Sequence, residues 1–176
     1  MRCPESSARL WYREIQESDA QSMFDMDSRK EVAKYVGNEP LKNIEESIAI
    51  IKNIRAQYQE NDIGRVAVIE KNTNRFIGWS GLKYYRSEIN GHQNFYELGY
   101  RFLPEFWGKG YAKESVQASL KFGFEILNLE KIFAYTHLQN KASQHILLGN
   151  GFILKNDFID LGDHCLWFEC ENPIKP

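Results

Sequence analysis

The chain has 176 residues, of which 43% are hydrophobic and 14% aromatic, and this is enough for one globular domain with its own core. Its formal net charge of −2 argues against a nucleic-acid-binding protein, because such proteins need a concentrated basic surface. The three cysteines, Cys3, Cys165 and Cys170, lack metal-binding spacing, and neither a signal peptide nor a membrane-spanning apolar run is found. We expect a single domain over residues 1–176 in the cytoplasm, with unreactive cysteines and no metal ion, nucleic acid or membrane as partner.

The first part of the chain predicts a strand followed by a helix. Residues 10–15 alternate enough to form an opening strand. Ser18 and Gln21 form a capping-box pattern at the start of the helix. We expect the acids Asp25 and Asp27 on this helix to face solvent.

Two more helices are expected before the first long sheet segment. The first covers residues 31–36 and ends at Gly37. After Pro40, Asn43 and Glu46 repeat the capping-box pattern and open a longer helix. The apolar side chains spaced along one face of that helix are Ile44, Ile48, Ile51, Ile54 and Tyr58. We expect this face to pack against the core.

An antiparallel meander follows these helices. Residues 66–70 and 76–85 flank a polar turn, and an Asn-Gly pair at residues 90–91 marks the next hairpin before a strand over residues 94–102. Each strand is short and joined to the next by a tight turn. The pattern therefore predicts sequential strands lying side by side.

The segment from Tyr96 to Gly123, YELGYRFLPEFWGKGYAKESVQASLKFG, joins a buried strand to a helix through a Gly-Lys-Gly loop. Gly108 and Gly110 allow backbone N–H groups to approach a ligand, and the helix beginning near Tyr111 directs its positive end to the same place. This order predicts a pyrophosphate site. A P-loop would need Ser or Thr after Gly-Lys, and a dinucleotide site would need a third glycine. A helix entry made flexible by two glycines stays an alternative.

A second strand–helix unit follows in residues 131–152, KIFAYTHLQNKASQHILLGNGF, where Asn140 opens the helix and Gly149 and Gly151 end it. The strand–helix–strand order requires a right-handed crossover and a parallel strand pair. Residues 152–160 and 164–170 then form a closing hairpin. We expect an α/β (α+β) fold with a mixed, mostly antiparallel sheet of about seven strands and helices on both faces.

Two motifs in these units resemble the GCN5-related N-acetyltransferase (GNAT) superfamily. Residues 107–112, WGKGYA, are similar to the Arg/Gln-x-x-Gly-x-Gly/Ala loop that holds the pyrophosphate of acetyl-coenzyme A, with Trp107 where the family has Arg or Gln. Asn140 and Ser143, followed by Gly151-Phe152, resemble the branch that contains the ribosomal-protein N-terminal alanine and serine acetyltransferases. The resemblance spans nearly the whole chain. It implies an N-acetyltransferase whose two parallel strands splay apart at the cofactor cleft.

The same resemblance implies how the cosubstrate acetyl-CoA is held. Backbone groups from Tyr100 to Leu103 would pair with the pantetheine arm, and N–H groups near Phe102 would stabilise the oxyanion. Asn140 would contact the cofactor arm, or it is simply the N-cap of its helix. The residues expected to bind the cofactor are Tyr100, Phe102, Leu103, Trp107, Gly108, Lys109, Gly110, Tyr111, Ala112 and Asn140.

Acetyl transfer to an amine needs a neutral amine, a stabilised oxyanion and a departing thiolate. Glu97, on the strand that leads into the cleft, is the candidate base, and the alternative is a surface glutamate paired with Arg101. Ser143 is the candidate donor to the thiolate, because the resembled branch has serine where many members use a tyrosine. Its alternative role is that of an ordinary helix residue. The histidines form no catalytic set.

We expect direct attack of the amine on the thioester, without a metal ion or an acyl-enzyme. A modest base suffices for an N-terminal acceptor, since an α-amino group has a pKa of about 7.7–8 and a lysine amine one of about 10.4. The preferred acceptor is the N-terminal α-amine of a protein or peptide. Polyamines, amino acids and cationic antibiotics stay open, as does a module that binds acyl-CoA without turnover. Both a monomer and a homodimer fit the sequence.

Overall fold

The computed structural model describes residues 1–36 and 39–173 of the chain. Gly37, the expected end of the second helix, lies outside the described residues. The elements follow in the order β1 (Leu10–Glu14), α1 (Ala20–Asp27), α2 (Lys30–Ala33), α3 (Ile44–Asn61), β2 (Val66–Glu70), β3 (Arg75–Tyr85), β4 (Phe95–Phe102), α4 (Tyr111–Lys121), β5 (Lys131–His137), α5 (Lys141–Leu148), β6 (Ile153–Asp160) and β7 (Asp163–Glu171). The strands lie within one residue of their predicted bounds.

In the described part of the chain, seven strands form one sheet in the order β1-β2-β3-β4-β5-β7-β6. Neighbouring strands are antiparallel in every case except β4 and β5. This arrangement confirms the mixed, mostly antiparallel sheet. It also places the parallel pair on either side of the segment that contains the Gly-Lys-Gly loop.

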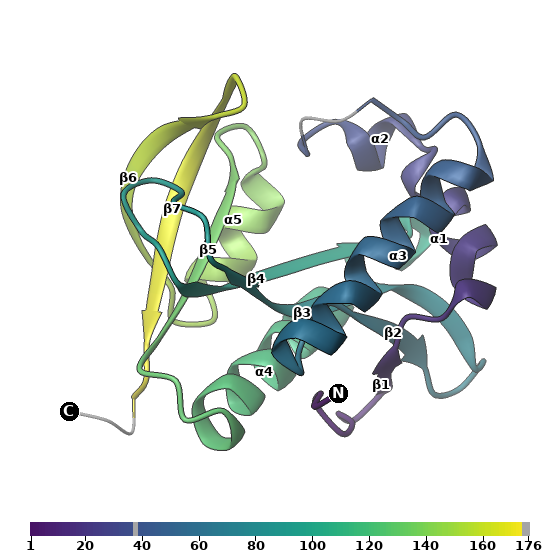
Figure 1. Cartoon of the computed structure of the whole chain (residues 1–176), viewed down its shortest axis with the longest axis horizontal. Coiled ribbons are helices and arrows are strands. Elements are labelled where there is room, and N and C mark those ends of the chain that lie inside the picture. Colours follow the sequence, from purple (N-terminus) through teal and green to yellow (C-terminus); the bar gives the residue numbers. More distant parts are fainter. Residues whose placement is uncertain (37–38, 174–176) are drawn as a thin grey trace.

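Helices cover both faces of the sheet (Figure 1). In β2, Ala67 packs with α1 and α3, whereas Val68 points to the other face and shares a cluster with Tyr111 of α4. α5 lies over the C-terminal strands, where Leu147 is buried with Ile132 of β5. α1 and α3 thus lie on one face of the sheet, and α4 and α5 lie on the other.

β4 and β5 pair at one point and then diverge (Figure 1). Among the described residues, Glu97 and Phe133 are the only Cα partners between them, while β4 stays paired with β3 as far as Phe102. β5 pairs with β7 along its whole length. The carboxyl end of β4 therefore has a free edge facing β5, and the expected splayed pair is confirmed.

The predicted cap of α3 is confirmed. Asn43 is the N-cap, and its side-chain oxygen accepts a hydrogen bond from the N–H of Glu46 at 3.1 Å. The carboxylate of Glu46 accepts from the backbone N–H of Lys42 at 2.9 Å and from the side-chain amide of Asn43 at 3.4 Å. Ile51, Ile54 and Tyr58 of the predicted apolar face are buried. Local sequence was sufficient here because the cap and the face lie on one helix.

The predicted capping box of Ser18 and Gln21 is wrong. A 3₁₀ turn begins at Glu17, and the carboxylate of Asp19 accepts from the N–H of Gln16 at 2.8 Å. The guanidinium of Arg13 also donates to Asp19, at 2.6 and 2.8 Å. A carboxylate bonded to both a backbone N–H and an arginine is a stronger cap than a serine hydroxyl, so the helical segment starts earlier than predicted.

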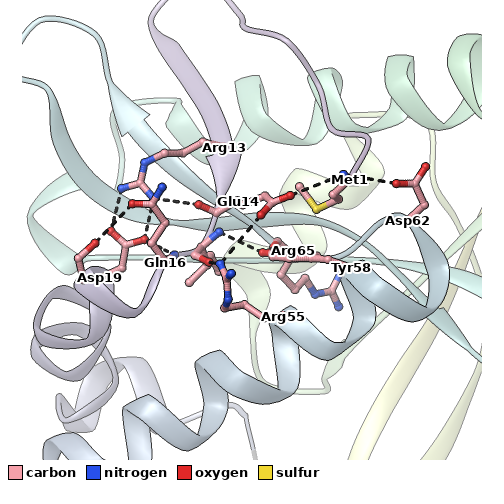
Figure 2. Close-up of polar contacts among 11 residues, drawn as sticks. Met1, Arg13, Glu14, Gln16, Asp19, Arg55, Tyr58, Asp62 and Arg65 are labelled. Carbon is pink, nitrogen blue, oxygen red and sulfur yellow. Dashed lines mark hydrogen bonds and ion pairs between the residues drawn. The ribbon is translucent and has the colours of Figure 1, made fainter.

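Tyr58 of α3 joins the end of β1 to the start of β2 (Figure 2). Its phenol oxygen accepts from the N–H of Ile15 at 3.1 Å and donates to the carbonyl oxygen of Arg65. Burial raises the pKa of Tyr58 to about 12, so the phenol keeps its proton at neutral pH. Arg55 donates to the carbonyl oxygen of Ile15 at 2.9 Å. These contacts fix the backbone of Arg65, whose side chain reaches the candidate site.

Candidate active site

The Gly-Lys-Gly loop has the backbone that an anion site requires. Gly108 and Gly110 have φ angles of +71° and +80°, in the left-handed region that glycine adopts readily. Gly110 is the N-cap of α4, so the first N–H groups of that helix face the ligand side of the loop. A Cβ atom at Gly108 would meet nothing within 4 Å. The loop is open there, and it fits a pyrophosphate bound by backbone N–H groups.

Arg9 also lies at this loop, although no sequence motif indicated it. Its guanidinium donates to the carbonyl oxygen of Lys109 at 2.9 Å, across 100 residues of chain, and to the carboxylate of Glu114 at 2.7 Å. It also lies 4.3 Å from the ring centroid of Tyr111. Burial acts to raise the pKa of Glu114, but hydrogen bonds from Arg9 and Ser7 outweigh it and hold that pKa below its ordinary value. Glu114 thus anchors a cation beside the loop.

Trp107 connects the loop to the end of β4. Its indole N–H donates to the carbonyl oxygen of Phe102 at 2.8 Å, and the residue is 48% exposed. The resembled family has Arg or Gln at this position, and an indole supplies neither a cation nor a flexible amide. The hydrogen bond instead ties the loop to the end of β4, which fixes the loop relative to the free strand edge.

The free edge of β4 directs backbone groups into the space that β5 leaves. The N–H of Leu103 donates to the carbonyl oxygen of Ile77 in β3 at 2.9 Å. Residues alternate along an antiparallel ladder, so the N–H groups of Tyr100 and Phe102 point away from β3 and toward the side of β5. An extended pantetheine arm can pair with such an edge as an additional strand.

Ser143 lies in the first turn of α5, close to the carboxyl end of β4. Asn140 is the N-cap of this helix and accepts a hydrogen bond from the N–H of Ser143 at 3.1 Å, so its capping role is confirmed and its cofactor contact stays a prediction. The hydroxyl oxygen of Ser143 lies 3.0 Å from the phenol oxygen of Tyr100. The candidate thiolate donor therefore has a side-chain partner on β4, which the sequence did not indicate.

Glu97 is a buried residue in an ion pair with Arg65. One guanidinium nitrogen of Arg65 donates to the carboxylate of Glu97, and another donates to the carbonyl oxygens of Glu97, at 3.0 Å, and Gly81. Gly99 makes room for this side chain, because a Cβ there would lie 2.5 Å from Nη2 of Arg65. The alternative pairing of Glu97 with Arg101 is wrong. Arg65 lies 32 residues away, beyond the reach of a local pattern.

Arg101 pairs instead with Asp27 at 2.8 Å. The expectation that Asp27 faces solvent is therefore wrong, since the residue is 5% exposed, whereas Asp25 is exposed as predicted. The ring of Trp79 lies between the two arginines, 5.4 Å from the guanidinium carbon of Arg65 and 5.3 Å from that of Arg101. This face of β4 thus borders two ion pairs with buried carboxylates, Glu97 of β4 with Arg65 and Asp27 of α1 with Arg101, next to an aromatic ring.

Aromatic side chains from β5 lie on the same side. The ring of His137 is 5.7 Å from that of Tyr35, which follows α2. The Nδ1 atom of His137 accepts from the N–H of Gln139 at 3.0 Å, so in the neutral ring the proton is on Nε2. Burial raises the pKa of Tyr135, and the negative charge of Glu97 raises it further. Tyr135 therefore lies within electrostatic reach of the candidate base.

Other features lie away from the candidate site. A cavity of about 460 Å³, lined by residues 92–96, 128–131 and 133, lies at the amino ends of β4 and β5, whereas ligands of such sheets bind at the carboxyl ends. Burial raises the pKa of Cys165 and Cys170 to about 11, which agrees with unreactive thiols. In the described part of the chain, no helix is long and apolar enough to cross a membrane.

Comparison with known proteins identifies the family. Residues 9–153 match the family model described as Acetyltransferase (GNAT) domain, and the chain belongs to this family. It is an N-acetyltransferase, an acyltransferase whose cosubstrate is acetyl-CoA.

Individual relatives agree with this assignment. The chain is 34% identical to the uncharacterized N-acetyltransferase YoaA of Bacillus subtilis over 144 residues, which cover 82% of this chain and 79% of YoaA. It is 23% identical to a spermidine N(1)-acetyltransferase of Vibrio cholerae, covering 88% of this chain and 84% of that enzyme. The crystal structure of ribosomal-protein-S5-alanine acetyltransferase from Vibrio fischeri matches with a TM-score of 0.73 at 20% identity, covering 96% of each chain. The last comparison shows the shared fold.

Proposed function

We propose that this enzyme acetylates the N-terminal α-amine of a protein or peptide by direct attack on the thioester of acetyl-CoA. The observation that carries the proposal is the pairing of each buried carboxylate on the acceptor side of β4, Asp27 and Glu97, with an arginine. A polyamine carries several positive charges and is bound best by carboxylates without another counter-charge. A peptide N-terminus has one titratable amine followed by neutral backbone, which suits this balanced charge.

The base requirement supports the same acceptor. Glu97 is the proposed base, and a proton on its carboxylate would leave Arg65 without a counter-charge at a buried position. Such a pair suits an acceptor amine that loses its proton easily. An α-amine, with a pKa of about 7.7–8, is partly neutral already at neutral pH, whereas a lysine or polyamine amine near 10.4 is almost fully charged.

The remaining groups have separate roles in the proposed reaction. The Trp107–Ala112 loop and the start of α4 would hold the pyrophosphate, with Lys109 as an additional cation. The N–H of Phe102 would stabilise the oxyanion as the amine adds to the thioester carbonyl. When the C–S bond breaks, its electron pair stays on sulfur, and the hydroxyl of Ser143 would donate a hydrogen bond to the thiolate. No acyl-enzyme is needed.

A thiol-release assay with matched acceptors tests this proposal. The acceptors are a lysine-free peptide that begins with Ala or Ser, the same peptide with a blocked N-terminus, and spermidine. We expect the free peptide to have a kcat/KM at least tenfold above that of spermidine, and the blocked peptide to be inactive. Equal release with the blocked peptide would contradict acetylation of the α-amine.

A polyamine is the second candidate acceptor, and the similarity to the Vibrio cholerae spermidine N(1)-acetyltransferase favours it. A kcat/KM for spermidine above that of every free peptide would select this candidate. A protein that binds acetyl-CoA yet releases no thiol with any amine would instead be a binding module. The three outcomes differ in one assay, so the acceptor class can be decided directly.

A further inference from the structure

The side chain of Tyr100 extends from β4 to α5. Its phenol oxygen lies 3.0 Å from the hydroxyl oxygen of Ser143 and 3.3 Å from the carbonyl oxygen of the same residue. Asn140 holds the backbone N–H of Ser143 at 3.1 Å. Ser143 is therefore fixed through its N–H by Asn140, and through both its carbonyl and its hydroxyl by Tyr100.

The hydroxyl groups of Tyr100 and Ser143 can be arranged in two ways, which differ in the atom that accepts the Tyr100 proton. In the first, the phenol donates its one proton to the carbonyl oxygen of Ser143, which can only accept. In this arrangement Ser143 donates its own proton to Tyr100. In the other arrangement Tyr100 donates to the hydroxyl oxygen of Ser143, and the serine proton is free to point toward a third atom. The shorter of the two distances belongs to the contact between the hydroxyls.

Burial keeps the phenol protonated in both arrangements. It raises the pKa of Tyr100 to about 12, and the hydrogen bond with Ser143 lowers it by less. A thiol has a pKa of about 8.5, so a phenol of this kind donates a hydrogen bond without giving up its proton. Tyr100 can therefore orient Ser143 over the whole neutral range.

We propose that Tyr100 is a positioning residue for the departing thiolate. It donates to the hydroxyl oxygen of Ser143 as the C–S bond breaks, and the freed proton of Ser143 then forms a hydrogen bond with the sulfur that keeps the electron pair. No proton leaves the Tyr100–Ser143 pair, and the thiolate is protonated later by water. The inference rests on the proposed role of Ser143, and it adds a residue that acts through that serine.

A double-mutant cycle tests this inference. Tyr100→Phe, Ser143→Ala and the double variant are compared in single-turnover acetyl transfer and in the acetyl-CoA dissociation constant. We expect Ser143→Ala to be slower by one to two orders of magnitude or so, and Tyr100→Phe to be slower by about fivefold to tenfold, with nearly constant acetyl-CoA affinity. The double variant should be no slower than Ser143→Ala, because Tyr100 acts only through the serine.

Tyr96→Phe is the matched control. Tyr96 lies on the same strand and, four residues before Tyr100, on the same face, and it packs beside the same core cluster. It should keep the parent rate, which shows that loss of a phenol hydroxyl from β4 is not harmful in itself.

The outcomes distinguish the role of Tyr100 from that of Ser143. A slow Ser143→Ala variant with a parent-like Tyr100→Phe variant would overturn the role of Tyr100 and leave that of Ser143 intact. Parent-like turnover in Ser143→Ala would overturn the proposed role of Ser143, and the inference with it. Multiplying rate losses in the double variant, or a loss of acetyl-CoA affinity in Tyr100→Phe, would also overturn the inference, because both indicate a contact with the cofactor or the fold rather than with the serine.

Discussion

The two sides of β4 are built from different kinds of contact. On the cofactor side, Gly108, Gly110 and the first turn of α4 are neighbours in sequence, and the groups that face a ligand are backbone N–H groups. On the acceptor side, Glu97 meets Arg65 across 32 residues and Asp27 meets Arg101 across 74. A site made of backbone depends on local conformation, whereas a site made of paired side chains depends on which elements become neighbours in the fold.

This difference predicts different phenotypes for the two sides. Changes at the loop should alter affinity for acetyl-CoA while the chemical step is preserved, because the backbone N–H groups there are proposed to bind the pyrophosphate, which is remote from the reacting atoms. Changes at the paired carboxylates should alter turnover or stability, since both carboxylates are buried in ion pairs on the proposed acceptor side of β4. The following substitutions test whether the two sides separate in this way.

The largest effect is expected at Glu97. Glu97→Gln keeps the shape of the side chain and removes the proposed base, so turnover should fall by about 10²-fold with nearly constant acetyl-CoA affinity. The acidic limb of the pH–rate profile should also disappear. Steady-state kinetics over a pH series and calorimetric binding of acetyl-CoA measure both quantities. An unchanged profile would mean that water or another residue is the base.

Asp27→Asn is the matched control for Glu97→Gln. It also removes the charge of a buried carboxylate from an arginine pair on the same face. Both variants should lose stability, because Glu97→Gln leaves the buried guanidinium of Arg65, and Asp27→Asn the half-buried guanidinium of Arg101, without a counter-charge. Only Glu97→Gln should lose turnover to the full extent. Equal losses of turnover in the two variants would indicate that the ion pairs have a structural role alone.

A stability loss of about 2 kcal/mol is expected for Gly99→Ala. The added Cβ would lie 2.5 Å from Nη2 and 2.7 Å from Cζ of Arg65, so the guanidinium must move from Glu97 or β4 must shift. Urea unfolding measures the loss, and turnover should fall as well. Gly91→Ala is a useful comparison, since a Cβ at Gly91 would meet nothing within 4 Å and its cost comes from a φ angle of +75° alone. A Gly99→Ala protein as stable as its parent would show that Arg65 moves freely.

A smaller effect, on affinity, is expected for Gly110→Glu. A bulky negative side chain at the N-cap of α4 would repel the pyrophosphate and weaken acetyl-CoA binding by at least about tenfold, or 1.4 kcal/mol. Gly91→Glu introduces the same residue at a similar φ angle, away from the loop, and should bind normally. Calorimetry measures both variants, and circular dichroism checks that they fold. Equal affinities would remove the loop from the cofactor site.

The same contrast explains what could be predicted from the sequence. Strand bounds, the mixed sheet, the cap at Asn43 and the loop geometry at Gly108 and Gly110 all follow from neighbouring residues, and each is confirmed. The partners Arg65 of Glu97 and Arg9 of Glu114 did not follow, because nothing in a single sequence pairs charges that lie 32 or 105 residues apart. The capping prediction at Ser18 failed for a local reason, since Asp19, which is also held by Arg13 of β1, accepts the N–H of Gln16 and caps the turn before Ser18 can.

The smallest effect is expected at Glu114, and it tests whether the cofactor side also depends on one distant pair. The carboxylate of Glu114 is 14% exposed and holds Arg9 beside the loop. Its pKa is lower in the folded state than in the unfolded chain, so its contribution to stability is present above the unfolded-state pKa and is lost as the pH falls through the folded-state pKa. Glu114→Gln should therefore lower the free energy of unfolding at pH 7 by about 1 kcal/mol. The difference from the parent should shrink in acid, where the parent carboxylate is protonated.

Urea titrations at several pH values measure this difference. The control is Glu125→Gln, at an exposed carboxylate 4.0 Å from Lys121, which should show no such pH dependence. A constant difference at every pH would mean that Glu114 stabilises the loop through packing and not through its charge.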